Sequence, residues 1–183
     1  MLAMISAVIA TLNDEARLGA TLAALAGPAI DGFVREVIVA DAGSADATLA
    51  VAEEAGARIV EAQGAAALGE GCAAARQPWL LLLKPGTRPQ AGWEQAAWRH
   101  LNDHAGVAGW FLLSLKAGGV GARLDEARAN LDARLFGRLR AEHGLLIPRR
   151  LFEELLERRP GPISLPLGLD RSALRTLGAR ILA

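Results

Sequence analysis

The sequence has almost no cysteine, no surplus of charge and no long apolar run, and each absence excludes a class of protein. Its 183 residues include one cysteine, Cys72, so no disulfide can form within the chain and no oxidising compartment is needed. Basic and acidic residues number 20 each, which argues against a nucleic-acid partner, because such proteins usually carry a basic surplus. No apolar stretch approaches the roughly 20 residues that a membrane span requires. We therefore expect a cytoplasmic protein without a transmembrane segment.

Lysine is also nearly absent. Of the 20 basic residues only Lys84 and Lys116 are lysines, and the other 18 are arginines. Together with the abundance of alanine, this bias is typical of a GC-rich genome rather than of a function. The first 13 residues contain an apolar run without a positively charged start or a small-residue cleavage site, which indicates a buried strand rather than a signal peptide.

What the sequence does have is a regular alternation of strand-like and helical patterns. Strands are expected at residues 5–11, 34–40, 58–61, 79–83 and 106–115. Helices are expected at residues 15–25, from Ser44 to about Ala55, at 65–76 and at 89–102, and Gly27-Pro28 is expected to stop the first of them. This alternation predicts an α/β fold with a mainly parallel sheet. In such a sheet, ligands bind at the carboxyl ends of the strands, where the strand order reverses.

The pattern changes in the last third of the chain. Residues 122–140 are predicted to form a helix with leucines on one side and arginines around the rest. A short strand at 144–147, a helix at 149–158 and a last helix at 170–177 are expected to follow. There is no internal repeat and no low-complexity linker, so one domain is expected.

Polar residues gather where the first two predicted strands end. They are Thr11, Asn13 and Glu15 after the first strand, and Asp41, Gly43, Ser44, Asp46 and Thr48 after the second. A carboxylate at the end of the second strand can accept a hydrogen bond from a base N–H or a ribose hydroxyl. The alternative is structural, with Asn13 and Ser44 capping helices and Asp41 bracing the turn.

Residues 6–25, 34–48 and 79–83 together resemble the family-2 glycosyltransferases. Among these, the chain is most similar to a short bacterial branch, the radical-SAM/selenodomain-associated transferases. The resemblance extends over the whole chain and implies a GT-A-type three-layer α/β sandwich. It also implies a single domain over residues 1–183, with a nucleotide-binding half at 1–116 and an acceptor-side half at 117–183. The implied reaction transfers a sugar from a nucleotide-diphosphate donor to an acceptor that the sequence does not identify.

Two functional positions of the family are changed in this chain. Gly86 stands after the fourth strand, where the family has the aspartate that holds Mg²⁺ or Mn²⁺ on the diphosphate. We therefore predict no metal cofactor. The acidic pair that supplies the family's general base falls near Pro166 and Leu167, and neither residue can take a proton. Three carboxylate or imidazole groups remain as candidates for that role: Glu142, His143 and Asp170.

The resemblance places the nucleotide near Thr11, Asn13 and Asp41. Lys84 and Arg88 flank the changed metal position, and both can bind phosphate, so we predict that they replace the charge of the metal. The alternative is that both side chains point into water from a loop that has lost its role.

Three functions stay open at this point. The chain is an atypical glycosyltransferase, an inactive relative that binds a nucleotide or regulates a partner enzyme, or a structural module. A nucleotide sugar or nucleoside diphosphate is the expected partner. The arginine pairs at 149–150 and 158–159 leave peripheral contact with membrane lipids open. His100 and His104, four residues apart, lack an acidic or cysteine partner nearby in the sequence, which favours two solvated histidines over a metal site.

Overall fold

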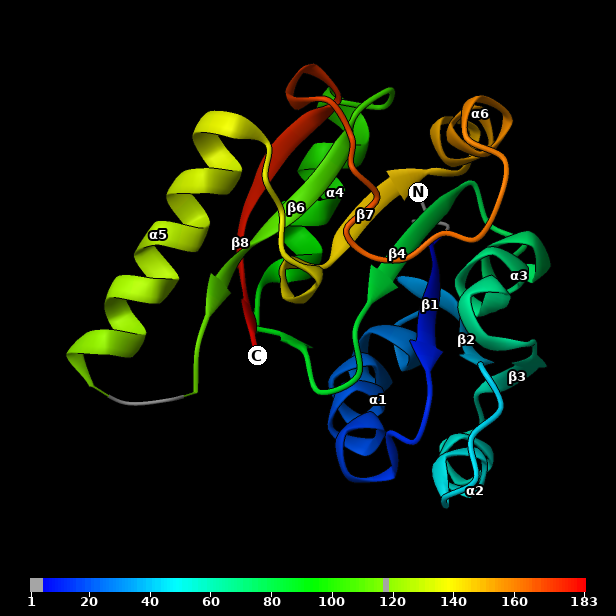
Figure 1. Ribbon diagram of the computed structural model, residues 1–183. Helices are drawn as coiled ribbons and strands as arrows, with labels where there is room; N and C mark the ends of the chain where they lie inside the picture. Colours follow the sequence, from blue (N-terminus) through cyan, green and yellow to red (C-terminus); the bar gives the residue numbers. More distant parts are fainter. Residues whose placement is uncertain (1–4, 117–118) are drawn as a thin grey trace.

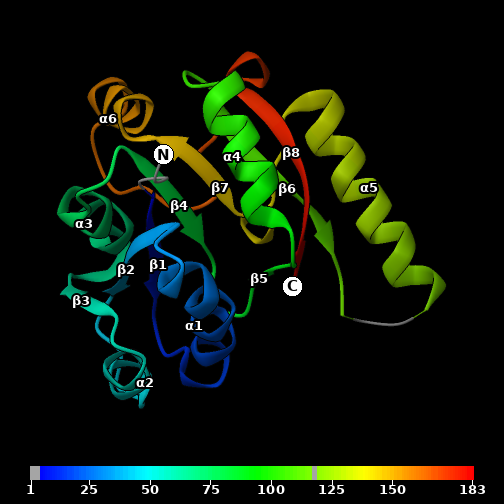
Figure 2. The ribbon, with the colours of Figure 1, turned by 180° about the vertical axis from the view of Figure 1, so that it is seen from behind.

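The computed structural model describes residues 5–116 and 119–183, which fold into an eight-stranded sheet with helices on both faces (Figures 1 and 2). The strands are β1 (Ile5–Thr11), β2 (Val34–Asp41), β3 (Arg58–Glu61), β4 (Trp79–Leu83), β5 (Arg88–Pro89), β6 (Ala108–Ser114), β7 (Leu145–Pro148) and β8 (Leu174–Leu182). The helices are α1 (Glu15–Ile30), α2 (Thr48–Glu54), α3 (Ala67–Ala74), α4 (Trp93–Asp103), α5 (Val120–Phe136) and α6 (Arg149–Arg158). Short 3-10 turns are η1 (Gly64–Ala66), η2 (Ala141–His143) and η3 (Arg171–Ala173).

The sheet is parallel in its first half and mixed in its second. Its strand order is β3-β2-β1-β4-β7-β6-β8-β5. Strands β3, β2, β1 and β4 run parallel to one another, and β8 runs parallel to β6. Strand β7 is antiparallel to β4 and β6, and β5 is antiparallel to β8. The predicted α/β class with a mainly parallel central sheet is confirmed. Because the order reverses at β1, the carboxyl ends of β1, β2 and β4 are the expected place for a ligand.

Alternate side chains of the central strands pack against two helical layers. Ile5, Ala7 and Ile9 contribute to a core shared with α1, α2 and α4, and Figure 2 shows α1 and α4 in front of the sheet. Val8 points to the other face, where the core includes residues of α3 and α6. Every residue of β4 is buried, since this strand has a neighbour on each side and helices over both faces.

Helix α3 approaches the sheet most closely at Gly71. A Cβ atom at this position would lie 2.7 Å from the Cβ of Ala40 and 2.9 Å from Cγ1 of Val8, so a larger residue would push the helix away. The neighbouring Cys72 is buried in the same layer, as the sequence predicts. Burial raises the pKa of its thiol to about 12, which makes it a packing residue and not a nucleophile.

The helices differ from the sequence prediction mainly at their ends. Helix α1 continues through Gly27 and Pro28 to Ile30 instead of stopping there. Helix α2 begins at Thr48 rather than after a Ser44 cap. Helix α4 starts late because residues 88–89 form β5 and pair with β8.

The predicted last helix is wrong, because residues 170–177 form η3 and the start of β8. Leu174, Leu177 and Ile181 are all buried, and their spacing imitates one face of a helix. In the structure β8 pairs with β6, and the register shifts where Gly178 takes a left-handed φ of 74°. This irregularity lets a strand bury residues at uneven spacing.

The prediction of two solvated histidines is wrong for His100, which is buried in α4. Its Nε2 lies 2.8 Å from the carbonyl oxygen of Val107. Burial lowers the pKa of His100, so the ring is neutral in the folded protein at pH 7.

Helix α5 lies at the flank of the molecule, far from α2 (Figure 1). Strand β6 pairs with β7 only at Gly109 and Trp110. Beyond them, the Leu113 N–H donates to Oδ1 of Asn130 (2.8 Å), and Nδ2 of Asn130 donates to the Leu113 carbonyl (2.9 Å). The side chain of one α5 residue thus holds this helix to the backbone of β6. Among the described helices, none is both long and apolar enough to cross a membrane.

Candidate functional site

A cavity of about 440 Å³ lies at the carboxyl ends of β1 and β4. This is a volume typical of small-molecule sites. It is lined by the end of β1, the loops after β2 and β4, the start of α3, and the segments near η2 and residue 164. Its polar lining side chains are Thr11, Asp14, Arg17, Lys84 and Ser164. Two of the five residues predicted to bind a nucleotide, Thr11 and Lys84, therefore share one cavity.

Asp41 lies directly behind this cavity wall and is only 2% exposed. Its carboxylate accepts hydrogen bonds from the backbone N–H groups of Gly43 (3.0 Å) and Ser44 (2.7 Å) and from the hydroxyl of Thr11 (3.1 Å). Burial opposes ionisation, but the Ser44 hydroxyl and these N–H donors outweigh it and lower the pKa of Asp41. The carboxylate holds the loop after β2 in place and orients Thr11, which does line the cavity.

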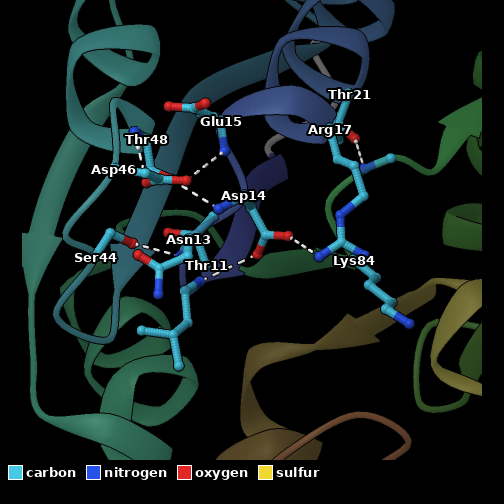
Figure 3. A network of polar contacts seen from close by, with 12 residues as sticks. Thr11, Asn13, Asp14, Glu15, Arg17, Thr21, Ser44, Asp46, Thr48 and Lys84 are labelled. Carbon is cyan, nitrogen blue, oxygen red and sulfur yellow. Dashed lines mark hydrogen bonds and ion pairs between the residues drawn. The ribbon is translucent and has the colours of Figure 1, made fainter.

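Asn13 takes part in a reciprocal clamp between the loops after β1 and β2 (Figure 3). It has a left-handed φ of 54°, its N–H donates to Oγ of Ser44 (2.9 Å), and its Oδ1 accepts from the N–H of Ala45 (2.8 Å). Three more hydrogen bonds join the loops: Asp14 N–H to Thr48 Oγ1 (2.8 Å), Glu15 N–H to Asp46 Oδ2 (3.2 Å) and Ala47 N–H to Glu15 Oε2 (2.8 Å). In this structure Asn13 and Ser44 tie two loops together and do not line the cavity.

Two cations line the cavity, and each is paired with a carboxylate. Arg17, from the first turn of α1, pairs with Asp14, and Nζ of Lys84 lies 2.6 Å from Oε1 of Glu142. Figure 3 shows Arg17 between Asp14 and Lys84. The sequence reasoning missed Arg17. The signal available was a basic residue three positions after Asp14 in the helix that follows β1.

Arg88 is not one of the residues that line the cavity. It begins β5 and pairs with Leu182 of β8. Its Nε is buried without a hydrogen-bond partner among the described residues. The cation beside Lys84 is therefore Arg17 and not Arg88.

The loop after β4 is a tight turn that needs glycine at position 86. Gly86 has a φ of 93°, and its N–H donates to Oγ1 of Thr21 (2.9 Å). The Thr87 hydroxyl donates to the carbonyl of Lys84 (2.6 Å) and closes the turn. A Cβ atom at Gly86 would lie 3.5 Å from the Cβ of Arg17. A carboxylate here would thus project toward the arginine.

The residues around the cavity do not fit a divalent metal. Such a cation needs one or more free carboxylates beside the phosphate oxygens. Asp14 and Glu142 are each paired with a cation, and Asp41 is occupied by N–H and hydroxyl donors. Within residues 5–116 and 119–183, no three histidine, cysteine or acidic residues cluster as metal ligands.

Of the three candidates for a general base, the structure brings only Glu142 close to the cavity. Burial raises the pKa of Glu142, but the hydrogen bond and charge of Lys84, a backbone hydrogen bond and the charge of Arg140 together outweigh this effect, so the pKa is lowered. His143, the last residue of η2, is completely buried, its Nδ1 accepts the N–H of Arg140 (2.9 Å), and burial lowers its pKa. Asp170 is exposed before η3 and is not one of the cavity-lining residues.

Comparison with solved structures supports the fold. The chain is similar to glucosyl-3-phosphoglycerate synthase from Mycobacterium tuberculosis in complex with Mn²⁺, uridine diphosphate and glucosyl-3-phosphoglycerate. The TM-score is 0.62 at 21% identity, over 96% of this chain and 70% of that one. A complex of the same synthase with phosphoglyceric acid gives a TM-score of 0.63. A structure described as a mycobacterial protein gives 0.62 at 20% identity, over 98% of this chain and 66% of that one.

These identities support the GT-A-type fold alone, and the comparison with curated proteins found no match. The sequence itself matches the family model of Glycosyl transferase family 2 over residues 6–134. The finer resemblance to the radical-SAM/selenodomain-associated branch stays a prediction. The family match extends from β1 into α5 and includes the loops after β1, β2 and β4, so the chain belongs to glycosyl transferase family 2.

Proposed function

We propose that this chain binds a nucleoside diphosphate or its sugar ester in the cavity after β1 and β4, and that Lys84 and Arg17 meet the diphosphate charge in place of a metal ion. The observation that carries the proposal is that both cations line this cavity, while the carboxylates nearest to them are already paired. The similar synthase holds uridine diphosphate together with Mn²⁺. The proposed difference lies in the source of positive charge.

Binding would exchange one anion for another. The diphosphate competes with Asp14 for Arg17 and with Glu142 for Lys84. Arginine can bind two phosphate oxygens at once, and lysine acts as a compact point charge. Both cationic side chains are about half exposed, so they can turn without opening the core. The same two cations would stabilise the leaving diphosphate when the bond to the sugar breaks.

The exchange also changes Glu142. The hydrogen bond from Lys84 holds the pKa of this carboxyl down against the effect of burial. Once Lys84 turns to the diphosphate, its hydrogen bond and charge are lost and the pKa of Glu142 rises, which makes this carboxylate a better proton acceptor. We therefore assign Glu142 as the base that takes the proton of the acceptor hydroxyl during sugar transfer.

A second candidate function is nucleotide binding without transfer. It is supported by the ion pair on Glu142 in the free protein and by the complete burial of His143. In that case the chain acts as a sensor or partner for another enzyme. The two functions share the binding site and differ in turnover.

Isothermal titration of uridine, guanosine and adenosine diphosphates tests the binding step. Lys84→Ala and Arg17→Ala should each weaken binding by about 1.5–3 kcal/mol, the scale of a charged hydrogen bond. EDTA should leave the wild-type affinity unchanged. Lys116→Ala is the matched control, because this other lysine is exposed and is not among the cavity-lining residues. Equal affinities for wild type and Lys84→Ala, or loss of binding in EDTA, would refute the proposal.

Turnover separates the two functions. Release of nucleoside diphosphate from a nucleotide sugar in wild type, lost in Glu142→Gln with binding retained, supports transfer. Tight binding with no release from any of the common nucleotide sugars, across a panel of acceptors, supports the sensor.

A further inference from the structure

Helix α5 presents an outward side that carries apolar and basic residues and no acidic ones. At 100° per residue, eight positions share this side. We call it the α5 outer face, and its members are Val120, Arg123, Leu124, Ala127, Arg128, Leu131, Arg134 and Leu135. All eight are exposed. Figures 1 and 2 show α5 at the flank of the sheet, with this helix as the outermost element there.

The apolar residues of this face form a continuous stripe. Val120 is 76% exposed, Leu124 65%, Leu131 53% and Leu135 46%. They lie within about 60° of one another around the helix, over about 22 Å of its length. Single exposed leucines are common on protein surfaces, but an aligned set of this kind marks a contact surface.

The charges on α5 are sorted by side. Arg123 and Arg134 flank the stripe on one edge, and Arg128 flanks it on the other. The three acidic residues of α5 lie outside this face: the exposed Asp125 accepts a bidentate pair from Arg140 (2.8 Å), Glu126 pairs with Arg180 (3.3 Å), and Asp132 lies about 40° beyond Arg128 around the helix. The surface that α5 offers to a partner is therefore apolar in the middle and positive along the edge of Arg123 and Arg134, while Arg128 on the other edge adjoins Asp125 and Asp132.

A second basic feature adjoins this face. A cavity of about 550 Å³ lies between α5, η3 and β8, and its lining includes Arg134, Arg171 and Arg175 but no acidic residue. The guanidinium of Arg171 donates from Nε to the backbone carbonyl of Arg134 (3.2 Å), which links η3 to the end of α5. Arg134 belongs to both the cavity and the outer face, so the positive surface continues from one to the other.

We infer that the α5 outer face docks on an anionic membrane surface. The apolar stripe would enter the boundary between headgroups and acyl chains, and the flanking arginines, with the arginine cavity, would contact lipid phosphates. A second copy of this chain fits less well, because pairing through the same face would bring the Arg123 and Arg134 edges of two helices together. This charge pattern commits the proposal to anionic lipid.

Helix α6 gives the contrast and the control. This helix and the residue after it contain the arginine pairs at 149–150 and 158–159, for which the sequence left contact with membrane lipids as an open alternative. Arg149 instead donates to the backbone carbonyl of Gln77 (3.0 Å), and Arg150 pairs with Glu154 (3.1 Å). Glu153 and Glu157 add further negative charge to this short helix. The arginines of α6 are thus balanced or used within the fold, while Arg123 and Arg134 form an edge of the α5 outer face that carries no acidic residue.

Vesicle co-sedimentation of the full chain tests the inference. The vesicles are phosphatidylcholine alone, or the same lipid with about a third of phosphatidylglycerol. We expect binding only to the second. Leu124→Ser with Leu131→Ser should weaken it at least about tenfold. Arg123→Gln with Arg128→Gln should also weaken it at least about tenfold, as should added salt.

Two control variants match these changes. Ile30→Ser removes an apolar residue that is 85% exposed at the end of α1. Arg150→Gln with Arg158→Gln removes the same charge from α6. Both should bind anionic vesicles like wild type, and thermal melting should show every variant folded, because the changed side chains are exposed.

The inference is overturned if wild type does not bind anionic vesicles, if it binds both kinds of vesicle equally, or if the α5 variants bind as well as wild type. It is also overturned if wild type dimerises in solution and the leucine variant is monomeric.

Discussion

The two sides of the candidate nucleotide cavity are held by different kinds of interaction. In the loops after β1 and β2, the carboxylate of Asp41 accepts from backbone N–H groups and lies out of solvent. In the loop after β4, Lys84 and Glu142 contact each other through side chains alone, with 41% and 32% of those side chains exposed. The first arrangement cannot change unless the backbone moves. The second can exchange partners, which is what a binding site needs.

The comparison predicts its largest effect on stability at Asp41. Asp41→Ala leaves two backbone N–H groups and two hydroxyls near the cavity without their acceptor, and should lower the free energy of unfolding by about 3 kcal/mol or more. Urea unfolding measures this loss. Asp46→Ala, on the exposed side of the same clamp, should cost clearly less. If Asp41→Ala unfolds at the same urea concentration as wild type, the Asp41 carboxylate does not hold the loop after β2 in place.

Gly86→Asp should have the next largest effect, because a residue with a side chain is strained at a φ of 93°. We expect a loss of about 1–2 kcal/mol in the free energy of unfolding. The new carboxylate would face Arg17, so Mn²⁺ binding should appear only when Arg17→Ala is added. Titration calorimetry with Mn²⁺ compares the two variants. Mn²⁺ binding by Gly86→Asp alone would mean that Arg17 does not occupy this space.

Acid unfolding should separate Asp41 from Glu142. The folded pKa of Asp41 lies below the ordinary value of 3.8, so its ionisation stabilises the protein above that pH, and this contribution is lost as pH falls through 3.8 toward the folded pKa. Asp41→Asn should reduce the pH dependence of the free energy of unfolding in this range. The size of the reduction should be smaller than the total loss of stability in Asp41→Ala. Glu142→Gln should change the slope less, since its ion pair is half exposed. Because each variant is compared with wild type, the contributions of the buried His100 and His143 to the pH dependence are the same in both and cancel. If the free energy of unfolding depends on pH equally in Asp41→Asn and Glu142→Gln, the proposed difference between the two carboxylates is wrong.

The smallest effect is expected for Lys84→Ala on stability. A half-exposed ion pair contributes about 0–1 kcal/mol, so the free energy of unfolding should change by no more than that, while nucleotide affinity falls much further. Urea unfolding and calorimetry on the same preparation give both values. A stability loss as large as that of Asp41→Ala would place Lys84 among the bracing residues.

Much of the first half of the fold could be predicted from the sequence, because each strand there is a short continuous apolar run bounded by polar or glycine residues. Strand β8 could not, since Leu174, Leu177 and Ile181 repeat at helical spacing and only pairing with β6 makes them a strand. The position of Asp41 at a strand end was predictable. The direction of its carboxylate was not, because it depends on the backbone N–H groups of the next loop.

The candidate site could also be predicted only in part from the sequence. Lys84 follows a predicted strand and was found by its place in the sequence. Arg17 reaches the same cavity only because α1 folds back beside the loop after β4, where its Cβ lies 3.5 Å from the position that a Cβ at residue 86 would take. No short-range pattern links residues that are about 70 positions apart in this way.

The hydrogen bonds between Asn130 and Leu113 have a consequence for solubility. The Asn130 amide donates to and accepts from the backbone of Leu113, as the peptide group of a neighbouring strand would. It therefore occupies the place of a neighbour strand beyond the short pairing of β6 with β7. Unpaired strand edges recruit strands from other molecules and lead to aggregation. Helix α5 therefore covers a stretch of β6 that would otherwise be open to pairing with strands of other molecules, and it does so with a residue that contributes nothing to the apolar core.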